Sequence, residues 1–191
     1  MKDSDITQTE DNEPQEIHYA VSTTKLYVMS VFTFGLYMWY WYYKNWEIER
    51  NRTNEDISPF WRAVFCLFYT HSLYDRFDWR ARERQLNLSW NPDSLATITV
   101  ILIFLDGFIE RICSNTVGIG VLDYVSLLMG FIVIIPIAQA QKIVNQVNND
   151  PGGRLNAKFS SSNILLIILA GLIWTLSFTI SFFAHLLSPS V

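Results

Sequence analysis

Long uncharged runs alternate with polar connections along this chain. The longest of these runs cover residues 26–43, 94–105, 124–141 and 159 to the C-terminus. About 20 apolar residues suffice to cross a hydrocarbon core that is ~30 Å thick. A helix satisfies its own backbone hydrogen bonds in lipid, so helices are the expected spanning elements. The pattern predicts an all-α polytopic membrane protein with four transmembrane helices, at about 24–43, 94–112, 116–138 and 162–187.

A fifth apolar stretch, residues 60–74, is rich in aromatic side chains but contains Arg62 and His71. It is too short to span a bilayer without tilt or local thinning, and strongly charged residues follow it. We therefore expect an interfacial or re-entrant helix here, with its rings at headgroup depth. The alternative interpretation is a short fifth span.

Composition supports a membrane domain rather than a soluble one. Of the 191 residues 50% are hydrophobic and only 17% are charged, which is too little charge to cover a soluble globule of that size. Residues 24–188 are predicted to form a single membrane domain. Residues 1–24 hold one lysine against six acidic residues. This acidity predicts a disordered tail over 1–23 and argues against nucleic acid as a partner, and the tail lacks signal-peptide features.

Lysine and arginine are distributed unevenly between the connections. Residues 44–93 carry eight of them, the turn between the second and third spans carries only Arg111, and the last connection carries Lys142, Arg154 and Lys158. The positive-inside rule places the first and last connections in the cytoplasm. With four spans, both termini are then expected outside.

Aromatic and basic side chains gather where the first predicted span would leave the bilayer. Residues of this kind anchor helices at the membrane surface. The predicted anchors are Trp39, Tyr40, Trp41, Tyr43, Lys44, Trp46, Trp61 and Arg62.

Several short motifs stand out within these elements. The first predicted span carries T-F-G-L-Y-x-x-Y-W-x-Y-K over residues 33–44, and Trp46 follows it. The others are Ser58-Pro59-Phe60-Trp61-Arg62-Ala63, N-x-x-N-N-D-P over residues 145–151, and Phe159 with Asn163. Gly35, inside the first motif, either allows close approach of another helix or marks a helix break, and we favour close approach.

With these motifs, most of residues 22–175 resembles a family of small bacterial multi-pass membrane proteins of unknown function. The resemblance implies a location in the bacterial inner membrane. It implies no catalytic residues, because the family has none that can be transferred to this chain.

Ionisable side chains lie near the turn between the second and third predicted spans. Asp106 and Asp123 are equally far from that turn along the chain, so both should lie about 12 Å below it. Glu110 shares a helix face with Asp106, and Arg111 and His185 are expected in the same outer layer. One hypothesis is a proton or cation site, because ionisable groups at this depth are costly and need a role or a partner. The favoured alternative is that these groups pair with one another and only fix the packing.

A second polar group, Asn145, Asn148 and Asn149, is predicted at a cytoplasmic helix end. These asparagines either dock the interfacial helix or a partner, or form a solvated helix end. Cys66 and Cys113 are expected to be buried thiols. No metal, phosphate-loop or nucleophile motif is present, so no cofactor is predicted.

These patterns favour a non-enzymatic scaffold or interaction subunit in contact with the lipid bilayer. Its partner would be a second copy of the chain or another membrane protein. A small proton- or cation-conducting bundle is the alternative.

Overall fold

The computed structural model describes residues 16–113 and 121–187, with the backbone alone at 113, 121–127, 181–182 and 184–187. Every regular element within these ranges is helical, which confirms the predicted all-α class. The elements are α1 (Thr23–Phe32), α2 (Leu36–Thr53), α3 (Pro59–Val64), α4 (Cys66–Glu83), α5 (Pro92–Cys113), α6 (Val121–Val147), the 3₁₀ turn η2 (Arg154–Asn156) and α7 (Ser161–Leu187).

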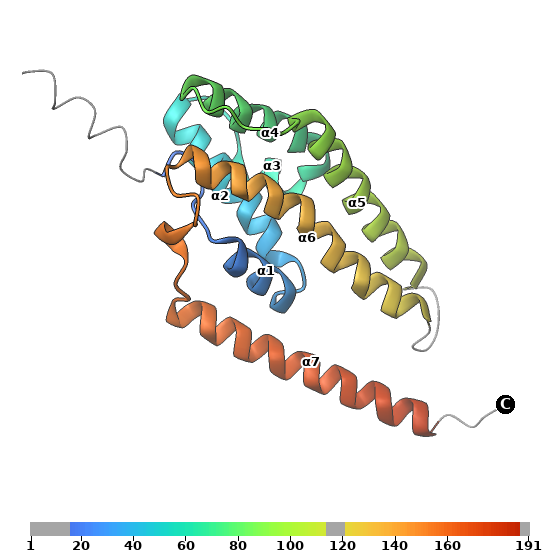
Figure 1. The fold of residues 1–191 in the computed structure, drawn as a ribbon. Helices are drawn as coiled ribbons and strands as arrows, with labels where there is room; N and C mark the ends of the chain where they lie inside the picture. Colours follow the sequence, from blue (N-terminus) through green and yellow to red (C-terminus); the bar gives the residue numbers. More distant parts are fainter. Residues whose placement is uncertain (1–15, 114–120, 188–191) are drawn as a thin grey trace, which may run out of the picture.

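Two long helices, α5 and α6, pack side by side, and the shorter helices gather around one end of this pair (Figure 1). That end holds the core, which includes the fully buried side chains of Trp41, Trp46, Tyr74 and Phe77. Helix α7 lies apart from the pair and packs mainly against α1 (Figure 1).

The predicted first span is broken into two helices. A three-residue turn, Thr33 to Gly35, separates α1 from α2, and both Phe34 and Gly35 have left-handed φ values of 52° and 82°. The Gly35 amide donates to the Ser30 carbonyl at 2.8 Å, which closes the turn. Gly35 therefore marks a helix break, because glycine adopts this conformation at little cost, and the favoured close-packing role was wrong.

Helices α1 and α2 form a hairpin whose two ends return to the same end of the molecule. The Tyr19 amide, before α1, donates to Asn45 Oδ1 in the middle of α2, at 3.1 Å. Arg52 in the last turn of α2 donates to the carbonyl of Ile17. A crossing from 24 to 43 would separate these residues by the thickness of a bilayer. The structure thus contradicts a span over residues 24–43. It also contradicts the expectation that residues 16–23 lie outside while the connection 44–93 lies in the cytoplasm.

The predicted interfacial helix 60–74 is longer than expected and is divided at Phe65. It comprises α3 and α4, and α4 continues to Glu83. Large aromatic side chains remain exposed along it, namely those of Phe60, Trp61, Phe65, Phe68 and Trp79.

The remaining predicted helices are present, with shifted ends. Residues 94–112, 116–138 and 162–187 correspond to α5, α6 and α7, and residues 114–120 lie outside the described part of the chain. Helix α6 runs without a break through Pro136 to Val147. After it, Asn149 and Gly153 take left-handed φ values of 55° and 63°. Gly171 of α7 makes no close contact among the described residues, since a Cβ there would meet no atom within 4 Å.

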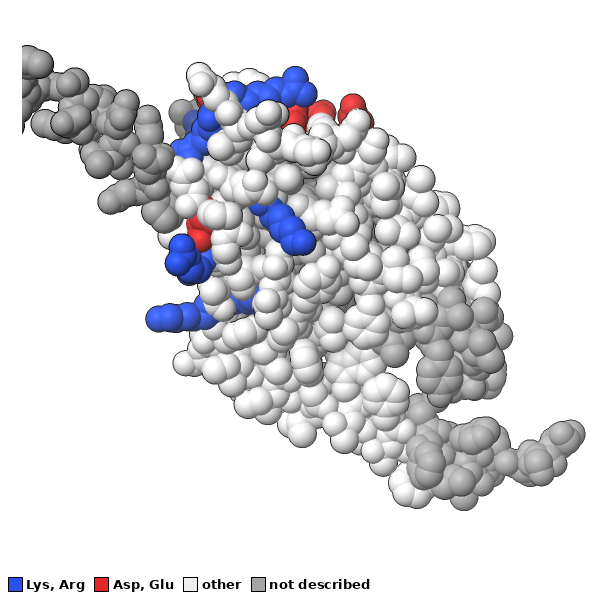
Figure 2. All heavy atoms as spheres, in the orientation of Figure 1, with Lys and Arg blue, Asp and Glu red and all other residues white. Residues whose placement is uncertain are grey.

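Within the described residues, two helices are long and apolar enough to cross a membrane, and they differ in burial. In α6, 56% of the stretch Leu128–Val147 is buried, whereas in α7 only 6% of Ser161–Ile180 is buried. On the face shown in Figure 2, charged side chains gather toward the end where α2, α4 and α6 finish, and none is seen on the other described residues of that face. We call this end the polar end.

Candidate functional site

At the polar end, an extended segment precedes α1 and lies inside the protein. Residues 17–22, here called the strap, form no regular element, yet His18, Tyr19, Ala20 and Val21 are buried. The disordered tail predicted over 1–23 is therefore wrong for residues 16–23, which belong to the folded body. Residues 1–15 lie outside the described residues. A buried extended segment needs partners for its backbone groups, because each unpaired group costs about 1–3 kcal/mol.

Side-chain amides of α6 supply many of these partners. Gln141, Asn145 and Asn148 share one helix face because they are four and three residues apart. Asn148 accepts from the amides of Ile17 and His18 at 2.9 and 3.1 Å and donates to the His18 carbonyl at 2.9 Å. Gln141 donates to the Tyr19 carbonyl at 3.1 Å, and Asn145 to the Val21 carbonyl at 3.0 Å. Of the two roles predicted for the asparagines here, the solvated helix end does not apply to Asn145 and Asn148, and these side chains bind the chain's own strap instead of the interfacial helix.

The loop after α6 closes the other side of the strap. Asn156 Nδ2 donates to the Ala20 carbonyl at 2.9 Å, and the Ser22 amide donates to the Asn156 carbonyl at 3.4 Å. Gly153 lies so close that an added Cβ would stand 2.6 Å from Ser22 Cα. Only glycine fits this position, where the backbone is also left-handed.

A buried charged cluster stands beside the strap. The Glu49 carboxylate, 2% exposed, accepts from Arg76 Nη1 at 3.0 Å and lies 3.7 Å from Arg52 Nη1. His18 Nδ1 is 3.5 Å from Glu49 Oε1, and neither ring nitrogen has a hydrogen-bond partner within the described residues. Burial lowers the pKa of His18 well below its usual value of 6.5, and the cations of Arg52, Arg80 and Arg76 lower this pKa further. Since Arg76 already neutralises Glu49, we take His18 to be uncharged at neutral pH.

The T-F-G-L-Y motif forms the turn of the α1–α2 hairpin. The Thr33 hydroxyl donates to the Met29 carbonyl at 2.7 Å and accepts from the Tyr37 amide at 3.0 Å, so one side chain joins both helices. The Phe34 ring stacks on Trp174 of α7 with 4.6 Å between ring centroids. The hydroxyls of Tyr37 and Tyr19 lie 3.0 Å apart. The motif therefore has a structural role that links the hairpin to the strap and to α7.

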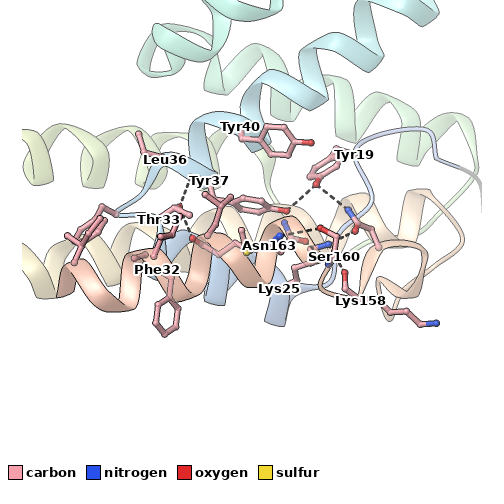
Figure 3. Close-up of a pocket in the computed structure, with 17 residues that line it drawn as sticks. Tyr19, Lys25, Phe32, Thr33, Leu36, Tyr37, Tyr40, Lys158, Ser160 and Asn163 are labelled. Carbon is pink, nitrogen blue, oxygen red and sulfur yellow. Dashed lines mark hydrogen bonds between the residues drawn. The ribbon is translucent and has the colours of Figure 1, made fainter. Parts of the chain in front are cut away.

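A cavity of about 780 Å³ lies between the hairpin and α7 (Figure 3). Polar groups line the part near the strap and the loop before α7: Tyr19, Lys25, Tyr37, Tyr40, Asn156, Lys158, Ser160 and Asn163. The remaining wall is mostly apolar, with Met29, Phe32, Thr33, Phe34, Leu36, Leu166, Leu169, Ala170 and Ile173. The cavity is thus polar at the end near the strap and mostly apolar over the rest of its length.

The structure divides the predicted membrane anchors into two groups. Trp41 and Trp46 are fully buried in the core, so they cannot reach a membrane surface, and this part of the prediction was wrong. The Trp41 indole donates to Gln141, and the Arg62 guanidinium lies 4.2 Å from the centre of the Trp46 ring. Trp39, Tyr40 and Trp61 are exposed, Tyr43 is half-buried, and Lys44 pairs with Glu47.

The predicted ionisable layer is only partly described. Asp106 is half-buried, and its Oδ1 has no hydrogen-bond partner among the described residues, while Glu110 and Arg111 are exposed. The side chains of Asp123 and His185 lie outside the described residues. Of the three described residues, Asp106, Glu110 and Arg111, none lines the cavity. Cys66 is a buried free thiol, as predicted, and the Cys113 side chain is not among those described.

No protein-family model, curated protein or solved structure matches this chain. The resemblance to a small bacterial membrane-protein family therefore stays a prediction.

Proposed function

We propose that this protein is a non-enzymatic integral membrane protein that acts as a scaffold or interaction subunit. Helix α7 carries the proposal. It is strongly apolar, only 6% of its stretch Ser161–Ile180 is buried, and it packs mainly against α1. A helix of this kind is typical of a membrane span, where lipid covers the apolar side chains. Its two threonines with described hydrogen bonds, Thr175 and Thr179, donate to carbonyls one turn back, which suits a lipid-facing helix.

We infer three spans rather than four, with α5 added to α6 and α7, the two described helices that are long and apolar enough to cross a membrane. Helix α5 has 22 residues and α6 and α7 have 27 each, so their lengths are about 33 and 40 Å against ~30 Å of hydrocarbon. The α1–α2 hairpin and α3–α4 would enter the bilayer from the polar end without crossing it. The arginines and lysines of the polar end would face the cytoplasm, and the chain would end on the opposite side. The family resemblance supports the bacterial inner membrane as the location.

The use of the polar residues supports a scaffold rather than an enzyme. At the polar end, the buried amides are hydrogen-bonded to the strap, and the buried Glu49 is paired with Arg76. Such groups stabilise one arrangement of the chain and are not presented to a substrate. The interaction partner is proposed to be a second copy or another membrane protein.

Labelling of single cysteines tests this topology. Cysteines would be placed at Glu16, Asn54 and Val191 in a chain whose native cysteines are replaced by serine. An impermeant maleimide applied to sealed inner-membrane vesicles of known orientation should label 16 and 54 from the cytoplasmic side and 191 from the other. Labelling of 16 and 54 from opposite sides would contradict the hairpin. Extraction of the protein at alkaline pH would contradict membrane integration.

Ion conduction remains the second candidate because Asp106 Oδ1 is buried without a hydrogen-bond partner among the described residues. Proton flux into liposomes that contain the protein, and loss of that flux in Asp106→Asn, would support it. Equal flux through both forms would contradict it.

A further inference from the structure

The cavity between the hairpin and α7 holds a buried cation without an acidic partner. Lys25 is 5% exposed, and its Nζ donates to Asn156 Oδ1 at 2.6 Å and to the Lys158 carbonyl at 2.8 Å. Both acceptors are neutral, and no described carboxylate forms a salt bridge with Lys25. An ammonium group has three donors, so one N–H remains for a ligand. A buried charge is costly unless it is paired, and an anion in the cavity would pair this one.

The rest of the polar part of the cavity also favours an anion. No Asp or Glu is found among the described residues that line it. The exposed Lys158 extends from its rim, and Ser160 and Asn163 lie beside Lys25 (Figure 3). The Tyr19 hydroxyl faces the same space. An oxyanion would therefore find the Lys25 cation and neutral hydrogen-bond donors together.

The whole cavity, from its polar part to its apolar end, extends over half of a bilayer's hydrocarbon thickness. On α7 its lining runs from Asn163 to Ile173, a rise of about 15 Å against ~30 Å of hydrocarbon, and the apolar part from Leu166 to Ile173 takes up about 10 Å of this rise. Leu166, Leu169 and Ile173 remain about half exposed along this wall. The stack of Phe34 on Trp174 lies at the inner end.

We propose that this cavity binds one anionic phospholipid of the leaflet at the polar end, with its phosphate at Lys25 and an acyl chain along α7. The inference rests on the proposed membrane location. The length of one leaflet and the exposed apolar wall favour a lipid over a soluble anion. The unpaired ammonium favours an anionic lipid over a zwitterionic one.

Quenching of tryptophan fluorescence by brominated lipid tests the site. The full chain would be placed in phosphatidylcholine vesicles with a minor fraction of phosphatidylglycerol, and the bromine would be on the acyl chains of either lipid. Phosphatidylglycerol should quench beyond its share, because Trp174 stands at the end of its chain. Trp174→Phe, which keeps an aromatic ring, should remove this excess.

Two variants and their controls separate the contacts of the lipid headgroup from those of its acyl chain. Lys25→Met should weaken the preference for phosphatidylglycerol about fivefold, whereas Lys142→Met, which removes an exposed charge outside the cavity, should not. Ala170→Leu fills the apolar wall and should reduce the excess quenching. Gly171→Leu adds its side chain to open space and should not. These pairs keep the test valid even if Lys25→Met lowers stability.

Vesicle flotation in the same samples distinguishes a failure of the lipid site from a failure of the proposed membrane location. A chain that floats with the vesicles but is quenched equally by both lipids would overturn the lipid site alone. Unchanged excess quenching in both Lys25→Met and Ala170→Leu would also overturn it. A chain that does not float would overturn the membrane location and the lipid site together.

Discussion

The polar end and helix α7 place their side chains in opposite ways. At the polar end, amides and carboxylates such as Asn148 and Glu49 are buried and bonded within the protein. Along α7, most leucine, isoleucine and phenylalanine side chains are exposed, and only one narrow face, with Ile167, Ala170 and Trp174, is covered. In water the second arrangement would be unfavourable, since each exposed apolar side chain forgoes about 1.5–3 kcal/mol of burial. The difference supports the proposal that the two regions have different surroundings, with hydrocarbon around α7.

The largest effect is expected where the polar end loses a buried charge. Glu49→Ala leaves Arg76 without its most buried partner, and we expect the free energy of unfolding to fall by about 3 kcal/mol. Glu47→Ala removes an ion pair with Lys44 at the surface and should cost about 1 kcal/mol or less. Thermal unfolding in detergent micelles, followed by tryptophan fluorescence, measures both. Equal losses of unfolding free energy in the two variants would show that the buried cluster does not stabilise the polar end.

The next largest effect is expected from a leucine-to-arginine substitution, which should act differently on α7 and near the polar end. Leu172 on α7 is 63% exposed and Leu155 near the polar end is 48% exposed. Leu172→Arg should oppose membrane integration by about 2.5–3.5 kcal/mol, while Leu155→Arg should be tolerated. The fraction of protein that resists alkaline extraction reports the difference. If both variants integrate equally well, α7 does not face hydrocarbon.

A smaller effect concerns the loop that closes the strap. In Gly153→Ala a Cβ would approach Ser22 at a left-handed backbone position, so we expect a loss of about 2 kcal/mol. In the neighbouring Gly152→Ala the added atom meets only the Arg154 side chain, at 3.6 Å, and stability should change little. Melting temperatures in detergent compare the pair. A loss in both variants, or in neither, would contradict the close packing of the strap.

The smallest effect is a dependence on pH. The folded pKa of His18 is lowered below its unfolded value near 6.5, so the unfolded chain takes up the proton first as pH falls. The contribution of uncharged His18 to the free energy of unfolding is thus fully present above pH 6.5. Below pH 6.5 this contribution falls by up to about 1.4 kcal/mol per pH unit. His18→Gln should flatten this slope between pH 6.5 and 5.5. A wild-type melting temperature that rises over this interval as pH falls would show that His18 is charged in the fold.

The sequence predicts the long helices better than it predicts the polar end. Helices α5, α6 and α7 follow from uncharged runs, because length and hydropathy suffice to define them. The hairpin did not follow, since residues 26–43 are long and apolar enough to span. Only Thr33 and Gly35 signal the turn, and glycine within an apolar helix is also common at helix contacts.

The strap was missed for a different reason. It adjoins an acidic tail, and its backbone partners come from residues more than 100 positions away, such as Gln141 and Asn148. A signal was present in the spacing of Gln141, Asn145 and Asn148 on one face of α6. Amides so arranged indicate a buried polar contact, but they do not identify the segment that they bind.

Nitroxide accessibility along α7 tests the central claim most directly. Spin labels would be placed one at a time at residues 164–180 of the protein in lipid vesicles, with a label at Leu155 as the reference. If α7 lies in hydrocarbon, labels at every exposed position of α7 will collide often with oxygen and rarely with a water-soluble nickel chelate. A label at Leu155 will show the reverse. High nickel accessibility on any continuous face of α7 would contradict the account, because that face would then lie in water.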